Sequence, residues 1–288
     1  MKSQLSYPKA FSFEFFPPRT EQGAEKLRSV SASLAELRPC FFSVTFGAGG
    51  STREHTYDTV VDLKTRTGID VAPHLSCIGS TREGIREILS AYKAQNVRHL
   101  VALRGDMPSG MRDTGEFSHA NELIEFIRAQ TGNHFFIEVA AYPEFHPQST
   151  DAQTDLRNFK RKVDAGADAA LTQYFYNPDA YFRFVDSCEA MGLDLPIVPG
   201  IMPITNYAQL ARFSDVCGAE IPRWIRKRME AYGEDAEALR AFGLDVTTEL
   251  CRKLLEGGAP GLHFYSMNQL YPTLAIWQAL GLENLRKK

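Results

Sequence analysis

The stretch Phe11-Ser-Phe-Glu-Phe-Phe-Pro-Pro18 places one ionisable residue, Glu14, in a short run that is otherwise mainly aromatic. Two prolines close the run and would end any helical hydrogen-bond ladder, so the stretch predicts a buried strand. If Glu14 lies in apolar surroundings, desolvation raises the pKa of its carboxyl group and makes it a better acid near neutral pH. The alternative is a glutamate at a strand end that pairs with a neighbouring arginine, and this stretch alone favours neither reading.

Strand-like and helix-like segments alternate from this stretch to the end of the chain. Apolar runs typical of strands cover residues 11–18, 40–46, 69–77, 99–106, 135–143, 169–175, 196–202 and 261–267. Helical spacing of apolar residues covers 20–37, 52–67, 81–94, 118–130 and 150–165, begins again at Pro178, and closes near Leu280. A longer helical region, 206–256, is expected to break at Ile221-Pro222 and at Gly243.

This alternation predicts the α/β class and a single (β/α)8 TIM barrel, in which each apolar strand is surrounded by helices. A doubly wound sheet is the weaker alternative. It usually has a glycine-rich turn after the first strand, but that position holds Pro17-Pro18, and Gly47-Ala-Gly-Gly50 does not match the dinucleotide fingerprint. No linker interrupts the sequence, so we expect one domain over residues 1–288.

Composition excludes several classes of function. A net charge of −3 gives no electrostatic footprint for nucleic acid, and no apolar run approaches the ~18 residues of a membrane helix. The five cysteines form neither a CxxC pair nor a cluster with histidines, so neither a disulfide framework nor a metal site is predicted. We therefore expect a cytoplasmic protein that binds neither nucleic acid nor membranes.

Polar residues recur near the carboxyl ends of the predicted strands, where barrel enzymes place their active sites. We expect the following to converge at one mouth: Glu14, Thr45, His74, Arg104, Asp106, Tyr142, Gln173 and Tyr265. The set is poor in basic residues for a phosphosugar enzyme and has no strand-end lysine for Schiff-base chemistry. It suits a planar organic cofactor, because Gly105 would let a flat ring approach the backbone closely. A polar network between strands is the alternative for any single member.

The predicted helix 150–165 carries Asp155, Asn158, Arg161 and Lys162 at helical spacing. A solvated helix face is the default interpretation of such a run. The functional alternative is that Arg161 and Lys162 neutralise a pyrophosphate, with Asn158 and Asp155 as hydrogen-bonding partners.

At this point the chain resembles a known family, the bacterial-type methylenetetrahydrofolate reductases, over nearly its whole length. The resemblance rests on the stretch 11–18 and on eight further motifs in order: Ser43-Val-Thr-Phe-Gly-Ala-Gly-Gly-Ser-Thr52, Pro73-His-Leu-Ser-Cys77, Leu103-Arg-Gly-Asp106, Ala141-Tyr-Pro-Glu-Phe-His-Pro147, Lys160-Arg-Lys-Val-Asp-Ala-Gly-Ala167, Thr172-Gln-Tyr-Phe175, Val198-Pro-Gly-Ile-Met-Pro203 and Leu262-His-Phe-Tyr-Ser-Met-Asn268. Any one motif is weak evidence, but the ordered set at successive strand ends is specific.

The resemblance implies FAD bound at the carboxyl ends of the strands and ping-pong hydride transfer from NADH or NADPH to 5,10-methylenetetrahydrofolate, giving 5-methyltetrahydrofolate. It makes Glu14 the general acid that helps the methylene bridge open, and Asp106 a residue beside flavin and folate. It assigns substrate contacts to Glu14, Gln173, Phe213, Tyr265 and Gln269. At Gln269 the family often has arginine, so a charged contact would be neutral here. It also implies that the chain is a homo-oligomer and that the S-adenosylmethionine-binding regulatory domain of eukaryotic relatives is absent.

For FAD, the resemblance points to residues from five motifs and from the helix 150–165. They are Thr45, His74, Arg104, Gly105, Asp106, Tyr142, His146, Asp155, Asn158, Arg161 and Lys162. Two alternatives remain at this stage: an FAD-dependent barrel dehydrogenase of the proline dehydrogenase kind, and a non-catalytic flavin- or folate-binding protein. Retention of both Glu14 and the Arg161–Lys162 pair argues against the second.

Overall fold

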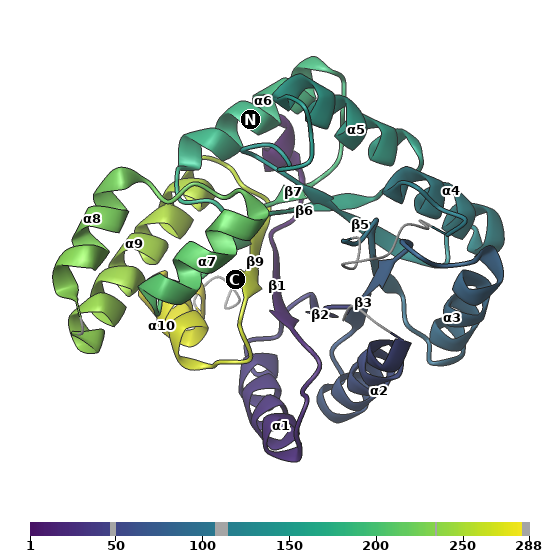
Figure 1. Cartoon of the computed structure of the whole chain (residues 1–288), viewed down its shortest axis with the longest axis horizontal. Coiled ribbons are helices and arrows are strands. Elements are labelled where there is room, and N and C mark those ends of the chain that lie inside the picture. The colour runs from purple at the N-terminus through teal and green to yellow at the C-terminus, as the bar shows by residue number, and fades with distance from the viewer. Residues whose placement is uncertain (47–49, 107–114, 234, 284–288) are drawn as a thin grey trace. The chain divides into compact units, whose positions relative to one another are not determined.

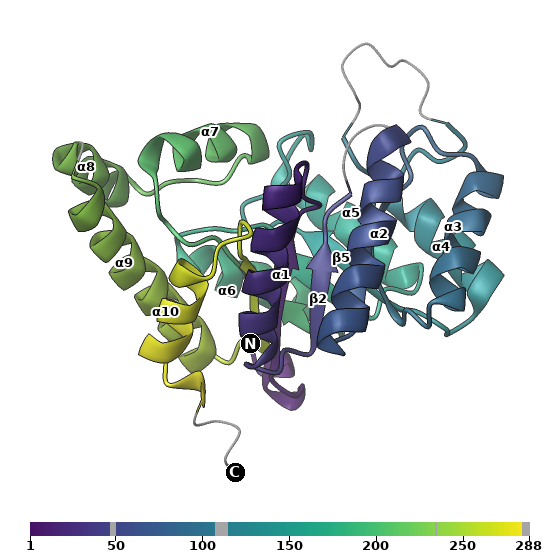
Figure 2. The same cartoon turned by 90° about the horizontal axis from the view of Figure 1, so that it is seen from below.

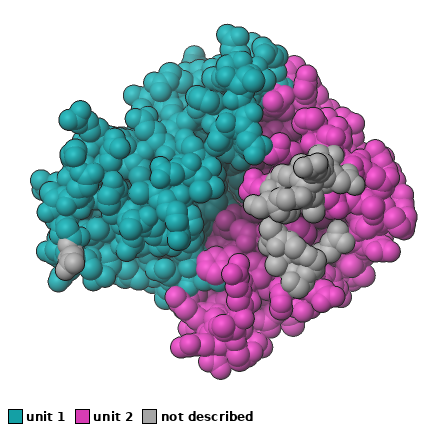
Figure 3. Space-filling view, in the orientation of Figure 1, with its two compact units in different colours: residues 1–11, 141–157, 171–288 teal, residues 12–140, 158–170 magenta. Residues whose placement is uncertain are grey.

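The computed structural model of the chain describes residues 1–46, 50–106, 115–233 and 235–283, with residues 50–53 described in their backbone only. Most of the expected Gly47 to Gly50 loop, residues 47–49, therefore lies outside the described residues. The chain divides into two compact units, coloured in Figure 3. Unit 1 comprises residues 1–11, 141–157 and 171–288, and unit 2 comprises residues 12–140 and 158–170.

Within the described ranges, nine strands belong to one sheet. They are β1 (Ala10–Phe15), β2 (Phe41–Val44), β3 (Val71–Ser76), β4 (His99–Leu103), β5 (Phe136–Ala141), β6 (Ala169–Thr172), β7 (Ile197–Val198), β8 (Gly200–Ile201) and β9 (Gly261–Tyr265). Their order in the sheet is β7-β6-β5-β4-β3-β2-β1-β9-β8. The two outer members, β7 and β8, are separated in the chain by Pro199 alone, so the segment 197–201 pairs with β6 through one part and with β9 through the other. The sheet thus closes on itself, which confirms the predicted (β/α)8 barrel.

Ten α-helices accompany these strands in the described part of the chain. They are α1 (Glu21–Ala35), α2 (Gly50–Thr67), α3 (Arg82–Ala94), α4 (Ala120–Thr131), α5 (Ala152–Asp164), α6 (Pro178–Ala190), α7 (Tyr207–Cys217), α8 (Arg223–Tyr232), α9 (Ala236–Glu256) and α10 (Tyr271–Ala279), after a 3-10 turn at Ser3–Ser6. Local capping explains several starts: Thr20 and Thr81 accept hydrogen bonds from Gly23 N and Gly84 N at the first turns of α1 and α3. No described helix is both long and apolar enough to cross a membrane.

The strands of unit 2 show why the aromatic run at the start of the chain folds as it does. β1 pairs in parallel with β2, placing Phe13 beside Phe42 and Glu14 beside Ser43. Because side chains alternate along a strand, the aromatic rings share one face, where Phe15 and Phe42 pack edge to face at 5.1 Å. Figure 1 shows α1, α2 and α3 outside these strands, and Figure 2 shows α1 and α2 running alongside β2.

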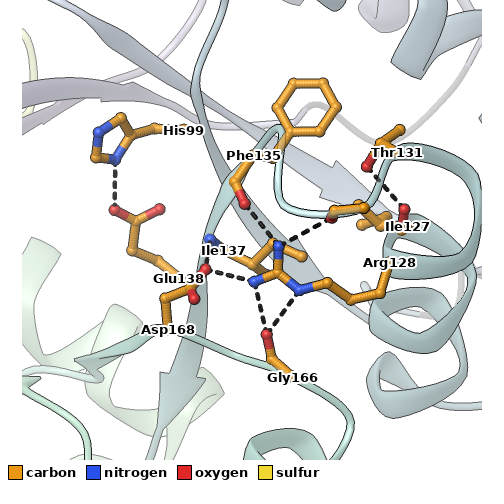
Figure 4. Close-up of polar contacts among 10 residues, drawn as sticks. His99, Ile127, Arg128, Thr131, Phe135, Ile137, Glu138, Gly166 and Asp168 are labelled. Atoms are coloured by element: carbon orange, nitrogen blue, oxygen red, sulfur yellow. Dashed lines mark hydrogen bonds and ion pairs between the residues drawn. The ribbon is translucent and has the colours of Figure 1, made fainter.

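Unit 2 also contains a side-chain clamp at the start of β5 (Figure 4). The guanidinium of Arg128, near the end of α4, donates to the carbonyl oxygens of Gly166 at 2.7 Å and of Phe135 at 2.7 Å. It also pairs with Asp168, whose carboxylate accepts a 2.7 Å hydrogen bond from Ile137 N. One side chain therefore joins α4, the start of β5 and the loop that follows α5.

In unit 1 the structure corrects one predicted helix break. The region 206–256 divides near Pro222, as expected, but α9 runs without interruption through Gly243. A Cβ atom at Gly243 would lie 2.1 Å from the carbonyl oxygen of Ile204, so this glycine permits a close approach of two backbone segments. The second break falls between Gly233, which ends α8, and Asp235, whose side chain accepts from Ala238 N at the start of α9. Figure 2 shows α8, α9 and α10 grouped together.

Candidate active site

Glu14 and His74 come together on neighbouring parts of unit 2. Glu14 lies in β1 and His74 in β3, and their Oε2 and Nε2 atoms are 3.2 Å apart. Both side chains are largely buried, with 15% of Glu14 and 11% of His74 exposed. The two groups form an ion pair when the imidazole is protonated, and the buried Nε2 of His74 makes no hydrogen bond among the described residues. An acid and an unsatisfied imidazole thus face each other inside the sheet.

The surroundings of Glu14 bear on the two interpretations that the sequence left open. Its strand neighbours Phe13 and Phe15 point to the opposite face, because side chains alternate along β1. The residue beside Glu14 in the register is Ser43, whose buried hydroxyl has no hydrogen-bond partner in the described part of the chain. Glu14 therefore lies next to polar groups rather than among phenylalanine rings. Neighbouring Thr45 extends the ladder beyond β2, with its N–H bonded to the Phe15 carbonyl at 2.9 Å.

The loop after β4 contains a constrained glycine. Gly105 has a φ of +84°, and a Cβ atom there would lie 1.8 Å from Oγ of Ser76. Ser76 in turn donates a 2.9 Å hydrogen bond to the Arg104 carbonyl, so the end of β3 holds this loop. Arg104 is half-buried and Asp106 is exposed. Only glycine fits this backbone, and the loop presents Asp106 to solvent.

The basic residues of α5 that belong to unit 2 have two different environments. Arg161 is exposed, and its guanidinium donates to the Asn158 side-chain oxygen at 3.2 Å. Among the described residues no carboxylate forms an ion pair with Arg161. Lys162 instead donates to the Ala140 carbonyl at the end of β5 and lies over the Phe159 ring. Arg161 therefore has the free charge that an anionic ligand needs, whereas Lys162 is also bound to the sheet.

In unit 1, the loop after β5 brings together three of the expected residues. The rings of Tyr142 and His146 pack edge to face with centroids 4.6 Å apart. Asp155, in the first turn of α5, accepts from His146 N at 3.2 Å and from the Ser149 hydroxyl at 2.9 Å. Asp155 thus orders the loop that carries Tyr142 and His146, a role that its position on the helix face did not reveal.

The ends of β6 and β9, also in unit 1, position Gln173 and Tyr265. Gln173 follows β6, and its N–H binds the Ala141 carbonyl at 2.8 Å. The Tyr265 hydroxyl donates a 2.7 Å hydrogen bond to the Thr172 carbonyl. A Cβ atom at Gly200 would lie 2.7 Å from the Tyr265 ring, so the absence of a side chain on β8 makes room for that ring. Tyr265 is held by both its hydroxyl group and its ring.

The other two expected substrate residues of unit 1 lie on a helix and in a turn. Phe213 is a half-buried residue of α7, and the guanidinium of Arg212 lies 5.6 Å from its ring centroid. Gln269 closes the turn after β9, with its N–H bonded to the Ser266 carbonyl at 2.9 Å. Convergence of the whole predicted set at one mouth stays a prediction.

Sequence reasoning did not identify several polar residues around the expected ones in unit 1. Tyr174, next to Gln173, bonds through its buried hydroxyl to Ser214 and Cys217 of α7. Glu144 accepts a 2.8 Å hydrogen bond from Glu220 N, and burial raises the pKa of Glu144. The sequence contained no local signal for these contacts, because they join segments about 40 and 76 residues apart.

A second titratable pair lies at the opposite ends of the strands in unit 2, where β4 and β5 begin. His99 Nδ1 is 2.9 Å from Oε1 of the fully buried Glu138, and its ring packs on Phe41. Burial lowers the pKa of His99, but the hydrogen bond and charge of Glu138 and the charge of Asp70 outweigh it and raise the pKa. Burial also raises the pKa of Glu138, and His99 opposes this effect. Figure 4 shows the pair beside the Arg128 clamp.

Comparison with known proteins assigns the chain to a family. The family model described as methylenetetrahydrofolate reductase matches residues 2–281. The 5,10-methylenetetrahydrofolate reductase of Salmonella typhimurium is 40% identical over 271 residues, which cover 94% of this chain and 90% of that protein. The chain belongs to the methylenetetrahydrofolate reductase family.

Other relatives of this methylenetetrahydrofolate reductase family member differ in length or in sequence. A rice protein named probable methylenetetrahydrofolate reductase (NADH) is 39% identical over 94% of this chain, which covers 48% of the rice protein. A solved Clostridium thermocellum protein, described as binding two copies of 5-methyl-5,6,7,8-tetrahydrofolic acid, has a TM-score of 0.65. It covers 99% of this chain and is matched over 98% of its own length at 17% identity, so it supports the fold alone.

The described residues fit the flavin cofactor that resemblance to the methylenetetrahydrofolate reductases implies. Arg161 carries a positive charge and donates to the side-chain amide of Asn158 rather than to a carboxylate among the described residues, which suits a diphosphate. The buried Nε2 of His74 and the glycine at position 105 supply an unsatisfied polar atom and a backbone without a side chain at strand ends. Within the described residues, no cluster of His, Cys, Asp and Glu could hold a metal ion.

Proposed function

We propose that the chain reduces 5,10-methylenetetrahydrofolate to 5-methyltetrahydrofolate, with FAD as bound cofactor and NADH or NADPH as electron donor. The observation that carries this proposal is the acid Glu14, held within β1 at 3.2 Å from the imidazole of His74. The family match over residues 2–281 supports the same substrate class. When bound, FAD supplies the hydride relay between nicotinamide and folate in ping-pong order.

Glu14 serves as the general acid in this proposal. The methylene bridge of the substrate joins two nitrogens, and one carbon–nitrogen bond must break before the carbon accepts hydride. The departing nitrogen keeps the electron pair of the broken carbon–nitrogen bond, and Glu14 gives its proton to that nitrogen. The methylene carbon is left as an iminium ion and becomes the methyl group once hydride is added. The Glu14 carboxylate then takes a proton from solvent. His74, on β3 and separated from β1 by β2, lies 3.2 Å from the carboxyl group.

Cofactor binding is proposed for residues of both units, each described by its own contacts. In unit 2, Asn158, Arg161 and Lys162 hold the diphosphate, and Thr45, His74, Arg104, Gly105 and Asp106 accompany the flavin. In unit 1, Asp155 orders the loop that presents Tyr142 and His146. We further propose that the chain acts as one catalytic barrel domain, 1–288, with FAD at the carboxyl ends of the strands, as in other barrel enzymes.

Substrate contacts are proposed for four residues of unit 1 in addition to Glu14. Tyr265 ends β9 and Gln173 follows β6, and their positions are fixed by hydrogen bonds with the main chain. Phe213 offers a flat apolar surface from α7, and Gln269 offers a neutral amide after β9. Asp106 is exposed beside Gly105, and we propose that it binds the polar edge of the pterin.

Stopped-flow spectroscopy of Glu14→Gln tests the proposal. We expect anaerobic NADH or NADPH to reduce the flavin of the variant about as fast as that of the wild type, while reoxidation by the folate slows by at least a hundredfold. Glu25→Gln, an exposed glutamate of α1, is the matched control and should leave both half-reactions unchanged. Normal folate turnover by Glu14→Gln would refute the acid assignment.

The same instrument separates the proposal from the other functions considered. Reduction of the wild-type flavin by proline instead of by a nicotinamide would indicate a dehydrogenase of the proline dehydrogenase kind. Flavin that neither donor reduces would indicate a binding protein. Steady-state rates with NADH and with NADPH determine the preferred donor.

We also propose a cytoplasmic homo-oligomer, which sedimentation tests. A single species at the chain mass of 32.3 kDa would contradict the assembly.

A further inference from the structure

The hydroxyl group of Tyr174 connects the end of β6 to helix α7 within unit 1. Tyr174 is 3% exposed, and its hydroxyl lies 3.1 Å from Oγ of Ser214 and 3.3 Å from Sγ of Cys217. The Cys217 thiol donates to the phenolic oxygen, which leaves the phenolic proton for Ser214. Ser214 and Cys217 are three residues apart, so they present neighbouring positions of one helix face to the same hydroxyl group.

A second contact secures the end of the same helix. Glu144, in the loop after β5, accepts a hydrogen bond from Glu220 N, three residues beyond the end of α7. Gly218 caps the helix after Cys217, and a Cβ atom there would lie 2.8 Å from Pro147 of that loop. The contacts at Glu220 and Gly218 fix the carboxyl end of α7, and the Tyr174 hydrogen bonds reach into its last two turns.

Phe213 lies next to Ser214 in α7, so the orientation of the helix about its axis determines where the Phe213 ring lies. Tyr174 directly follows Gln173, the other proposed substrate residue of this region. We propose that Tyr174 is a positioning residue, whose hydroxyl group fixes α7 and thereby sets the Phe213 ring against the substrate relative to Gln173. This inference rests on the proposed function for its effect on folate binding, whereas the connection between Tyr174 and α7 is independent of that function.

The variant Tyr174→Phe tests the hydroxyl group alone. It retains the ring, whose packing partners Tyr176 and Tyr265 lie at 5.9 and 6.4 Å, and removes both hydrogen bonds. Loss of about one net hydrogen bond corresponds to roughly a tenfold effect. We therefore expect the KM for the folate to rise about tenfold, with kcat changed by less than about twofold, because Phe213 binds the substrate and takes no part in proton transfer.

The reactivity of Cys217 gives a readout that does not depend on activity. Three of the five cysteines are buried and Cys40 is exposed, so Cys217 can be followed in a Cys40→Ser background with a maleimide and peptide mass spectrometry. Ser214→Ala leaves the Cys217 to Tyr174 hydrogen bond in place, so it reports motion of α7 rather than release of the thiol. We expect both Tyr174→Phe and Ser214→Ala to accelerate labelling of Cys217 several-fold.

Tyr207→Phe is the matched control, because it removes another tyrosine hydroxyl of α7, one that makes a 3.4 Å contact with Glu230 at the surface. It should change neither the labelling rate nor the KM. Unchanged labelling in Ser214→Ala would overturn the connection to α7, and faster labelling with an unchanged folate KM would overturn the positioning role. If the wild type fails to reduce the folate, the proposed function fails, and the labelling rates alone then decide whether Tyr174 holds α7. Circular dichroism verifies that each variant is folded.

Discussion

Replacing Arg128 with methionine removes the guanidinium that joins α4, β5 and the loop after α5 (Figure 4), while a side chain of similar length stays in place. The variant loses hydrogen bonds to the carbonyl oxygens of Gly166 and Phe135, both at 2.7 Å, and the ion pair with Asp168. A hydrogen bond from a charged donor contributes about 1.5–3 kcal/mol. Asp168 is 36% exposed, so its ion pair is discounted to about 0–1 kcal/mol.

The expected loss for Arg128→Met is therefore about 3–7 kcal/mol in the free energy of unfolding. Arg128→Lys can restore one of the carbonyl contacts and should lose about 2 kcal/mol. Urea unfolding followed by circular dichroism and by tryptophan fluorescence measures both values, and the m-value shows whether the variants unfold in the same manner as the wild type.

Arg86→Met is the matched control, because Arg86 lies on the surface of α3 and contacts Glu83 and Gln130 there. Its loss should stay below about 1 kcal/mol. If Arg128→Met lowered the free energy of unfolding no more than Arg86→Met does, the contacts of Arg128 with the carbonyl oxygens would stabilise the fold no more than contacts at the surface, and the reasoning would be wrong.

Three further predictions concern single positions. Helix propensity favours Gly243→Ala by about 1 kcal/mol, but the 2.1 Å approach of the new Cβ to a carbonyl oxygen should make the variant less stable by about 1–3 kcal/mol, as urea unfolding will show. The pKa of His99 is raised above 6.5 beside Glu138, so its contribution to stability is complete below pH 6.5 and is lost as the pH rises through the folded-state pKa. His99→Asn should flatten that decline above pH 6.5 in urea unfolding, and an unchanged slope would contradict the pairing. Gly105→Ala should lower the ratio of bound flavin to protein measured by absorbance, because the new methyl group would lie 1.8 Å from Ser76 Oγ and displace the loop.

The sequence predicted most of the fold because each strand combines an apolar run with a loop-forming end. The strand around Glu14 and the helix that begins after Thr20 lie where expected. Two local features needed the structure. Pro199 divides the seventh predicted strand into β7 and β8, and Gly243 acts through packing with Ile204, which no window along the chain contains.

The candidate site was only partly predictable. The rule that barrel chemistry lies at the carboxyl ends of strands placed Glu14 and His74 in the candidate set. Their contact depends on the register of β1, β2 and β3, which is set when the strands pair, so the sequence could not supply the 3.2 Å distance or the neighbouring Ser43. The role of Tyr174 was hidden for a related reason, since its partners belong to α7.

Closure of the sheet through residues 197–201 has a consequence for folding and solubility. A strand at the edge of an open sheet presents unpaired N–H and C=O groups that invite another chain to pair with it. In this sheet, the edges of β6 and β9 are both paired with the single segment 197–201, through β7 and β8 respectively. Until the segment docks, the nascent sheet has two open edges, and Pro199, which lacks an N–H group, makes the incoming segment itself a poor template for a foreign strand. Protection of both edges from foreign strands therefore depends on the pairing of residues 197–201 alone.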